Sequence, residues 1–190
     1  MPCSEFQSAR VAPATPPLRD EIQQQIDGVM RGRTPLALFT TLARDERLFN
    51  KFFSGGLLDR GHLTIRQREI VIDRVTAGRG AEYEWGVHVS VYGERAAFTK
   101  EEMTSLVSGS AEDPCWNATE SAIITLCDQL ESTSDVTDDL WSVLSDSFAP
   151  EAIIELVILA GHYRMISGLV KALRLPLEPG SARFGEYRTS

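Results

Sequence analysis

Hydrophobic and polar positions repeat with the spacing of α-helices along most of the chain. Apolar residues recur three and four positions apart, and no segment alternates residue by residue as a half-buried strand does. This pattern predicts an all-α fold. The helices are expected over residues 18–30, 35–43, 45–58, 65–77, 81–95, a short segment from 99, 116–130, 137–148 and 150–175.

Several of these segments begin with residues that favour a helix start. Thr34 precedes Pro35, Thr64 precedes an apolar run, and Thr99 is followed three residues later by Glu102, the spacing of a capping box. Before them, residues 8–17 hold three prolines and several small side chains, which exclude a helix interior. We therefore expect residues 1–17 to form an extended or disordered N-terminal arm, and residues 18–190 a single helical domain with a short C-terminal tail.

Composition and charge narrow the classes of partner. The chain has 190 residues, of which 43% are hydrophobic, a proportion typical of one globular core. Its net charge of -8 disfavours nucleic acid and anionic membrane surfaces, because a phosphate-binding protein needs a basic face. No apolar run is long enough to predict a membrane span, and no signal-peptide pattern is visible. Three scattered cysteines predict no disulfide framework, so we expect a cytoplasmic protein.

A glutamate lies on the core-facing stripe of the helix predicted over residues 65–77. The stripe consists of Ile65, Ile72, Val75 and Thr76, and Glu69 falls between the first two. A buried carboxylate is costly unless it is paired or protonated. Two interpretations remain open: a structural ion pair with a nearby arginine such as Arg68, or a residue of an active site.

Glu84 and His88 share one face of the next helix, because they are four residues apart. A carboxylate beside an imidazole orients the ring and favours its protonated form, so the pair has the composition of a general acid–base couple. A surface contact without function is the alternative. No metal-binding or cofactor-binding motif is present in the sequence, and we predict neither a metal nor a cofactor.

Two long stretches resemble the carboxymuconolactone decarboxylase and alkylhydroperoxidase D superfamily. They are LTIRQREIVIDRVTAGRGAEYEWGVHVSVYGERAAFTKEEMTSL, residues 63–106, and IELVILAGHYRMISGLVKALRLPLEPG, residues 154–180. The resemblance implies an alkylhydroperoxidase D-like helical bundle. It also implies a homo-oligomer, a trimer or a hexamer.

The resemblance assigns roles to four positions. In this family a helix carries a relay glutamate, and the next helix carries Cys-x-x-Cys with a histidine four residues after the second cysteine. Glu69 falls on the relay glutamate and His88 on the relay histidine. The two cysteine positions hold Ala81 and Glu84. A disulfide cannot form there, so a dithiol peroxidase mechanism is excluded at this site.

The remaining groups predict acid–base chemistry. The leading hypothesis is a non-redox lyase resembling carboxymuconolactone decarboxylase, which decarboxylates or isomerises a small lactone or an unsaturated carboxylic acid. His88 would be the general acid–base, Glu69 would orient or charge it, and Glu84 would be a second proton-transfer group or would hold the substrate. Two other hypotheses remain: a peroxidase that uses a cysteine elsewhere, such as Cys127, and a catalytically silent assembly protein.

Further residues are expected to bind the substrate. Tyr83 and Trp85 would form polar and aromatic pocket walls. His162 is either a satisfied core histidine or a second residue of the same cavity. A substrate carboxylate needs an arginine, for which Arg74 and Arg164 are the candidates.

Overall fold

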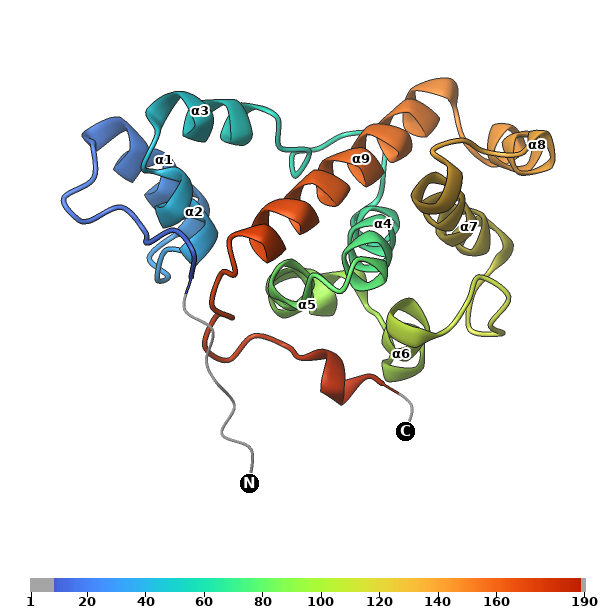
Figure 1. The fold of residues 1–190 in the computed structure, drawn as a ribbon. Helices are drawn as coiled ribbons and strands as arrows, with labels where there is room; N and C mark the ends of the chain where they lie inside the picture. Colours follow the sequence, from blue (N-terminus) through green and yellow to red (C-terminus); the bar gives the residue numbers. More distant parts are fainter. Residues whose placement is uncertain (1–8, 189–190) are drawn as a thin grey trace.

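The structure is a computed structural model that describes residues 9–188, and within this range the only regular secondary structure is helical (Figure 1). The all-α prediction is confirmed. The helices are α1 (Asp20–Met30), α2 (Ala37–Leu42), α3 (Glu46–Ser54), α4 (Ile65–Gly78), α5 (Glu82–Ala96), α6 (Lys100–Ser108), α7 (Ala118–Thr133), α8 (Asp138–Ser147), α9 (Pro150–Ala172) and the short 3₁₀ helix η1 (Phe184–Glu186).

The helix starts follow local sequence signals in most places. Thr64 caps α4 and Thr99 caps α6, each through a complete capping box, as predicted. The start of α2 differs from the prediction, since Thr34 does not cap it and Pro35 lies outside it. The carboxylate of Glu178, from the C-terminal tail, instead accepts a hydrogen bond from the backbone N–H of Ala37 at 2.6 Å. A distant residue thus replaces the local cap.

The main hydrophobic core surrounds α4. Helices α5, α6, α7 and α9 all pack on it, and α9 crosses the molecule diagonally in Figure 1. Within residues 9–188, α9 is the one helix that is long and apolar enough to cross a membrane by length and composition alone. One face of α9 is buried in the main core. Ile154, Ile158 and Met165 are exposed on its other face. The predicted homo-oligomer stays a prediction.

Helices α1, α2 and α3, residues 20–54, form what we call the N-terminal layer. This layer has a small hydrophobic cluster of its own, made of Ile22, Ile26, Met30 and Phe49. The segment before it contains no helix from residue 9 to residue 19, and the N-terminal arm stays a prediction. Backbone hydrogen bonds join Arg10 to Leu173 and Ala14 to Thr40, both at 2.9 Å. Residues 1–8 of the predicted arm lie outside the described residues.

The C-terminal tail after α9 returns across α5. Its backbone comes so close that a Cβ atom on Gly86 would lie 2.5 Å from the carbonyl oxygen of Ala182. Glycine at this position therefore permits the contact. The tail also places the rings of Phe184 and Tyr187 against Trp85, with ring centroids 4.8 and 5.5 Å away. The tail thus covers one face of α5 and leaves another face to the cavity described below.

Candidate active site

Glu69 of α4 and His88 of α5 meet in the interior between their helices. Oε2 of Glu69 lies 2.8 Å from Nδ1 of His88, which is the contact that Glu69 needs in order to orient the ring. The other carboxylate oxygen, Oε1, accepts two hydrogen bonds from the guanidinium of Arg68, at 2.9 and 2.7 Å. The side chains of Glu69 and His88 are 1% and 4% exposed. Glu69 is therefore paired with an arginine, as one interpretation expected, and it also contacts His88; its role in an active site stays a prediction.

The second ring nitrogen of His88 faces two further polar groups. Nε2 lies 3.0 Å from the hydroxyl of Tyr163 on α9 and 3.6 Å from Oε1 of Glu84. The first distance is that of a hydrogen bond, and the second is that of an ion pair without one. When both ring nitrogens are protonated, Nδ1–H donates to Glu69 and Nε2–H donates to the Tyr163 oxygen.

The surroundings of His88 favour its protonated form. Burial by itself lowers the pKa of this imidazole, because the charged form loses hydration. The carboxylates of Glu69 and Glu84 outweigh burial and raise the pKa of His88 to about 10. At neutral pH the ring is therefore an imidazolium between two carboxylates, and it can donate a proton.

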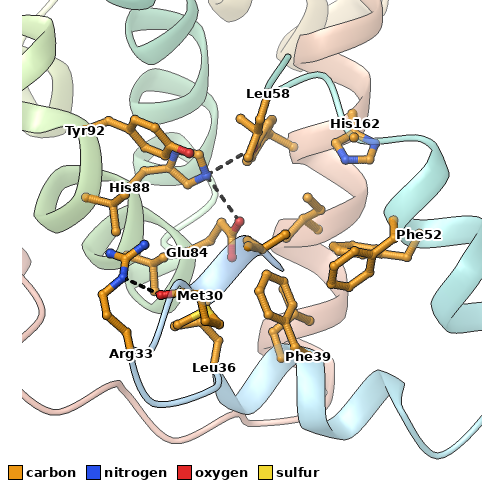
Figure 2. A pocket seen from close by; sticks show the side chains of 18 of the residues that line it. Met30, Arg33, Leu36, Phe39, Phe52, Leu58, Glu84, His88, Tyr92 and His162 are labelled. Carbon is orange, nitrogen blue, oxygen red and sulfur yellow. Dashed lines mark hydrogen bonds and ion pairs between the residues drawn. The ribbon is translucent and has the colours of Figure 1, made fainter. Parts of the chain in front are cut away.

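A cavity of about 260 Å³ opens on this cluster, and we call it the His88 cavity (Figure 2). The α5 and α9 side supplies the polar groups Glu84, His88, Tyr92, His162 and Tyr163. The opposite side comes from the N-terminal layer and the segment after it, and is mainly apolar. Its members are Val29, Met30, Arg33, Leu36, Leu38, Phe39, Phe52, Phe53, Gly56, Leu58 and Asp59.

Glu84 is the carboxylate of the cluster that lines this cavity; Glu69 lies behind His88 and does not reach it. The side chain of Glu84 is 7% exposed. An acid–base pair at the wall of a largely apolar cavity can remove a proton from one atom of a bound molecule and supply a proton to another. The arrangement has the geometry required for proton transfer.

Tyr83 and Trp85 do not line the cavity, which corrects their expected place in its wall. Successive residues of a helix point about 100° apart, so neither neighbour of Glu84 shares its face. Trp85 is fully buried beneath the C-terminal tail. The hydroxyl of Tyr83 accepts a hydrogen bond from the backbone N–H of Leu38 at 3.0 Å and donates to Glu178 at 2.5 Å. Tyr83 therefore joins the N-terminal layer to the tail.

Arg74 and Arg164 also lie away from the cavity, so neither is placed to bind a substrate there. Arg74 makes a bidentate ion pair with Asp128 of α7, with both N–O distances at 2.7 Å. Its remaining terminal nitrogen donates to backbone carbonyls around the end of α6. Arg164 lies on the other face of α9, within reach of the carbonyl oxygen of Leu130 and the carboxylate of Glu131. Both arginines connect helices.

His162 lines the cavity, which is one of the two places that the sequence left open for it. Its ring packs edge-on to Tyr163 and tilted against Phe52, with centroid distances of 5.5 and 6.0 Å. Burial lowers the pKa of His162, although Glu84 opposes this effect. His162 is thus a neutral aromatic wall residue at neutral pH, in contrast to His88.

Several residues at or near the site were not expected from the sequence, among them Tyr92, whose ring centroid lies 5.5 Å from that of His88. Tyr163 follows His162 directly and carried no motif, Arg33 lies in a loop, and Asp73 lies one turn after Glu69 on α4. Asp73 is 1% exposed, and neither of its oxygens has a hydrogen-bond partner among the described residues. Asp73 lies one helical turn after Glu69, on the same core-facing side of α4. This spacing could have predicted that Asp73 is buried.

Among residues 9–188, no cysteine lines the His88 cavity. Ala81 is buried at the start of α5, and Cys127 lines a separate hollow between α4, α7 and α9 together with Arg164. Burial raises the pKa of the Cys127 thiol well above its ordinary value. Within residues 9–188, no cluster of three His, Cys, Asp or Glu side chains forms that could hold a metal ion.

Comparison with solved structures relates the fold to the alkylhydroperoxidase D type. An uncharacterized peroxidase-related protein from Silicibacter sp. TM1040 superposes with a TM-score of 0.80 at 15% identity, covering 92% of this chain and 94% of that one. The alkylhydroperoxidase AhpD core of a peroxidase-related protein from Ralstonia eutropha JMP134 gives 0.73 at 16%, covering 90% and 89%.

The debrominase Bmp8, solved as a cysteine-to-alanine variant with 2,3,4-tribromopyrrole, gives a TM-score of 0.72 at 15% identity and covers 91% of this chain and 94% of that one. No protein-family model and no curated protein sequence matches the chain. At these identities the structural likenesses show the fold, which confirms the predicted alkylhydroperoxidase D-like helical bundle.

Proposed function

We propose that the protein is an enzyme that transfers protons without redox chemistry, and that it decarboxylates or isomerises a small lactone or unsaturated carboxylic acid. One observation carries the proposal. An imidazolium, His88, and a carboxylate, Glu84, lie 3.6 Å apart at the wall of a cavity that is otherwise mainly apolar. An apolar surrounding strengthens the interaction of these charges with a reacting molecule.

The position of each residue determines its role in the proposed reaction. Glu84 removes a proton from a carbon next to the substrate carbonyl, and the C–H electron pair moves into a dienolate. In a decarboxylation, the bond to the carboxylate breaks instead and its electron pair forms the same species. His88 then supplies a proton, directly or through the Tyr163 hydroxyl that its Nε2 contacts. Glu69 acts as a positioning residue, because it touches His88 and not the cavity.

The two other hypotheses receive less support. A peroxidase that used Cys127 needs an ionised thiol near His88, whereas this thiol lies in another hollow and burial opposes its ionisation. A silent assembly protein has no need of a cavity at the relay residues, and such a cavity is present. The homo-oligomer, the cytoplasmic location and the absence of a cofactor remain predictions.

Proton exchange is the direct test. Purified protein is incubated in D₂O with a panel of small unsaturated lactones and carboxylic acids, and deuterium incorporation and CO₂ release are followed by NMR and mass spectrometry. We expect turnover of at least one compound, lowered about 100-fold or more in His88→Gln. His62→Gln is the matched control, since His62 is exposed and lies outside the cavity.

Two results contradict the proposal. The first is turnover that His88→Gln leaves intact. The second is hydroperoxide consumption with a dithiol reductant that is robust in the wild type and lost in Cys127→Ala, which establishes the peroxidase alternative.

A further inference from the structure

The side of the His88 cavity opposite the acid–base pair points to the substrate class. We propose that Arg33 binds a carboxylate of the substrate, so that the substrate is a small apolar acid about one ring in size, and that this carboxylate is retained during the reaction. The inference rests on the proposed proton-transfer function and makes it more specific.

Arg33 is the one arginine or lysine among the described residues that line the cavity. Its Nε donates to the carbonyl oxygen of Met30 at 3.2 Å, and its terminal nitrogens make no hydrogen bond or ion pair within residues 9–188. Figure 2 shows its guanidinium turned toward the side of the cavity where His88 and Tyr92 lie. Arg66, Arg68 and Arg74 differ, because carboxylates already occupy them. A planar pair of N–H donors beside a cavity matches a carboxylate.

The local backbone fixes where Arg33 lies. Arg31 and Gly32 both have left-handed conformations, with φ of 49° and 83°, and these end α1 and reverse the chain. The backbone N–H of Arg33 then donates to the Met30 carbonyl at 3.0 Å, the same oxygen that its Nε contacts. The turn and the side-chain contact together hold the stem of Arg33 at the cavity.

The remainder of the cavity selects an apolar frame of limited size. Aromatic and aliphatic side chains of the N-terminal layer line it, among them Phe39, Phe52 and Phe53. A dry cavity of ~150 Å³ accepts one benzene ring, so a volume of about 260 Å³ fits one ring with short substituents. A flat, unsaturated acid satisfies both the aromatic walls and Arg33.

Charge orients such an acid in one direction. Glu84 and Asp59 also line the cavity, and a substrate carboxylate placed beside either one is repelled. His88 is also cationic, but its two ring nitrogens already face Glu69, Tyr163 and Glu84. The carboxylate therefore binds at Arg33, and the unsaturated carbon frame reaches Glu84 and His88. An ion pair with Arg33 stabilises the carboxylate but not neutral CO₂, so the group that Arg33 holds is not the group that is lost.

The reaction that follows is the shift of a double bond. Glu84 takes a proton from a saturated carbon, the C–H electron pair becomes the new double bond, and the electron pair of the old double bond takes a proton from His88. Glu84 then returns a proton to the imidazole across the 3.6 Å that separates them. Protons and electrons balance, and no oxidant or reductant is required.

Binding of a matched pair of compounds tests the role of Arg33. trans-Cinnamate and its neutral amide, cinnamamide, are titrated into the full-length protein by calorimetry and by NMR. We expect cinnamate to bind about tenfold more tightly than cinnamamide, the effect of one charge-assisted contact. Arg33→Gln removes this preference and leaves cinnamamide affinity within about twofold, whereas Arg33→Lys keeps part of it. Arg31→Gln is the control, because it removes the same charge from the same turn outside the cavity.

Equal affinity for acid and amide, undetectable binding of cinnamate, or a preference that survives Arg33→Gln overturns the inference. The proposed function fails separately. If the wild type exchanges protons in a His88-dependent manner while Arg33→Gln binds cinnamate normally, the acid–base function stands and the role of Arg33 is wrong. If cinnamate binds through Arg33 but no compound of the panel reacts, the anion site stands and the enzyme proposal is wrong.

Discussion

The two walls of the His88 cavity differ in what they bury. The α5 and α9 wall carries an imidazolium and a carboxylate, supported from behind by Glu69 and Arg68 of α4. The wall from the N-terminal layer carries mostly hydrophobic side chains and one arginine. The first wall belongs to the main hydrophobic core, whereas the second contributes Leu38 to that core and Met30 to the small cluster of the N-terminal layer.

This difference has a physical reason. A buried charge is tolerated only where its partners are held in place, and the large core around α4 holds Arg68, Glu69 and His88 in contact. Apolar contacts are not directional and need less support. We therefore expect the α5 and α9 wall to determine the chemistry and the N-terminal layer to determine what is bound.

The largest expected effect comes from removing the charge of Glu69. Glu69→Gln leaves the guanidinium of Arg68 buried without its carboxylate, so we expect a loss of about 3–5 kcal/mol in the free energy of unfolding. Chemical denaturation measures it. Glu102→Gln is the matched control, because its arginine, Arg66, is more exposed and keeps Glu120 as a second partner. Equal losses of unfolding free energy in the two variants would contradict the idea that the buried charges behind the α5 and α9 wall depend more strongly on their partners than exposed charges do.

The same variant changes the pH dependence of stability. The pKa of His88 rises from 6.5 in the unfolded chain to about 10 in the folded protein. Its contribution to stability is therefore complete below about pH 6.5 and is lost as the pH rises through about 10. Denaturation between pH 6 and pH 10 should show this decline in the wild type. In Glu69→Gln the decline should be smaller, because the strongest partner of the imidazolium is gone.

The next effect concerns the contact between the N-terminal layer and the rest of the molecule. Tyr83→Phe removes the hydroxyl that joins the Leu38 N–H to Glu178, which leaves the buried N–H of Leu38 without its partner, while Glu178 keeps the N–H of Ala37. We expect a loss of about 1–3 kcal/mol and faster amide exchange in α2. The His88 resonance should titrate as in the wild type. A shifted His88 titration would show that the two walls are not independent.

Asp73→Asn is expected to stabilise the protein. Burial, and secondly the charge of Glu69, raise the pKa of Asp73 well above 3.8, although His88 opposes them. The folded protein thus holds a proton that the unfolded chain releases, and stability falls as the pH rises above about 3.8. Asparagine resembles the protonated acid and removes this penalty. Thermal melts at pH 7.5 should show a rise, with ~2–4 °C for each kcal/mol. A lower midpoint contradicts the raised pKa of Asp73.

The smallest effect is the response of His88 to the cavity carboxylate. Glu84→Gln should lower the pKa of His88, because a negative neighbour is lost, but by less than Glu69→Gln does. The reason is that Glu84 lies 3.6 Å from the ring without a hydrogen bond, whereas Glu69 lies at 2.8 Å with one. NMR titration of the ring measures both variants. An unchanged pKa of His88 in Glu84→Gln would mean that the Glu84 carboxylate does not interact with the His88 ring.

The sequence determined the helices and part of the site. Apolar spacing of three and four, together with the caps Thr64 and Thr99, specifies helices because these signals act within a few residues. The same short range places Glu84 and His88 on one face of α5 and puts Glu69 on a buried stripe of α4. These features could be predicted because each depends on neighbours along the chain.

Tertiary structure alone decided the partners of the charged and polar side chains. Arg74 meets Asp128, which is 54 residues away, and Tyr163 reaches His88 across 75 residues. Glu178 caps α2 across 141 residues, where the local signal of Thr34 and Pro35 predicted a different start. Arg33 reaches the cavity only because the N-terminal layer packs opposite α5 and α9. Helical periodicity encodes which face of a helix is buried, but it does not encode which distant side chain meets that face.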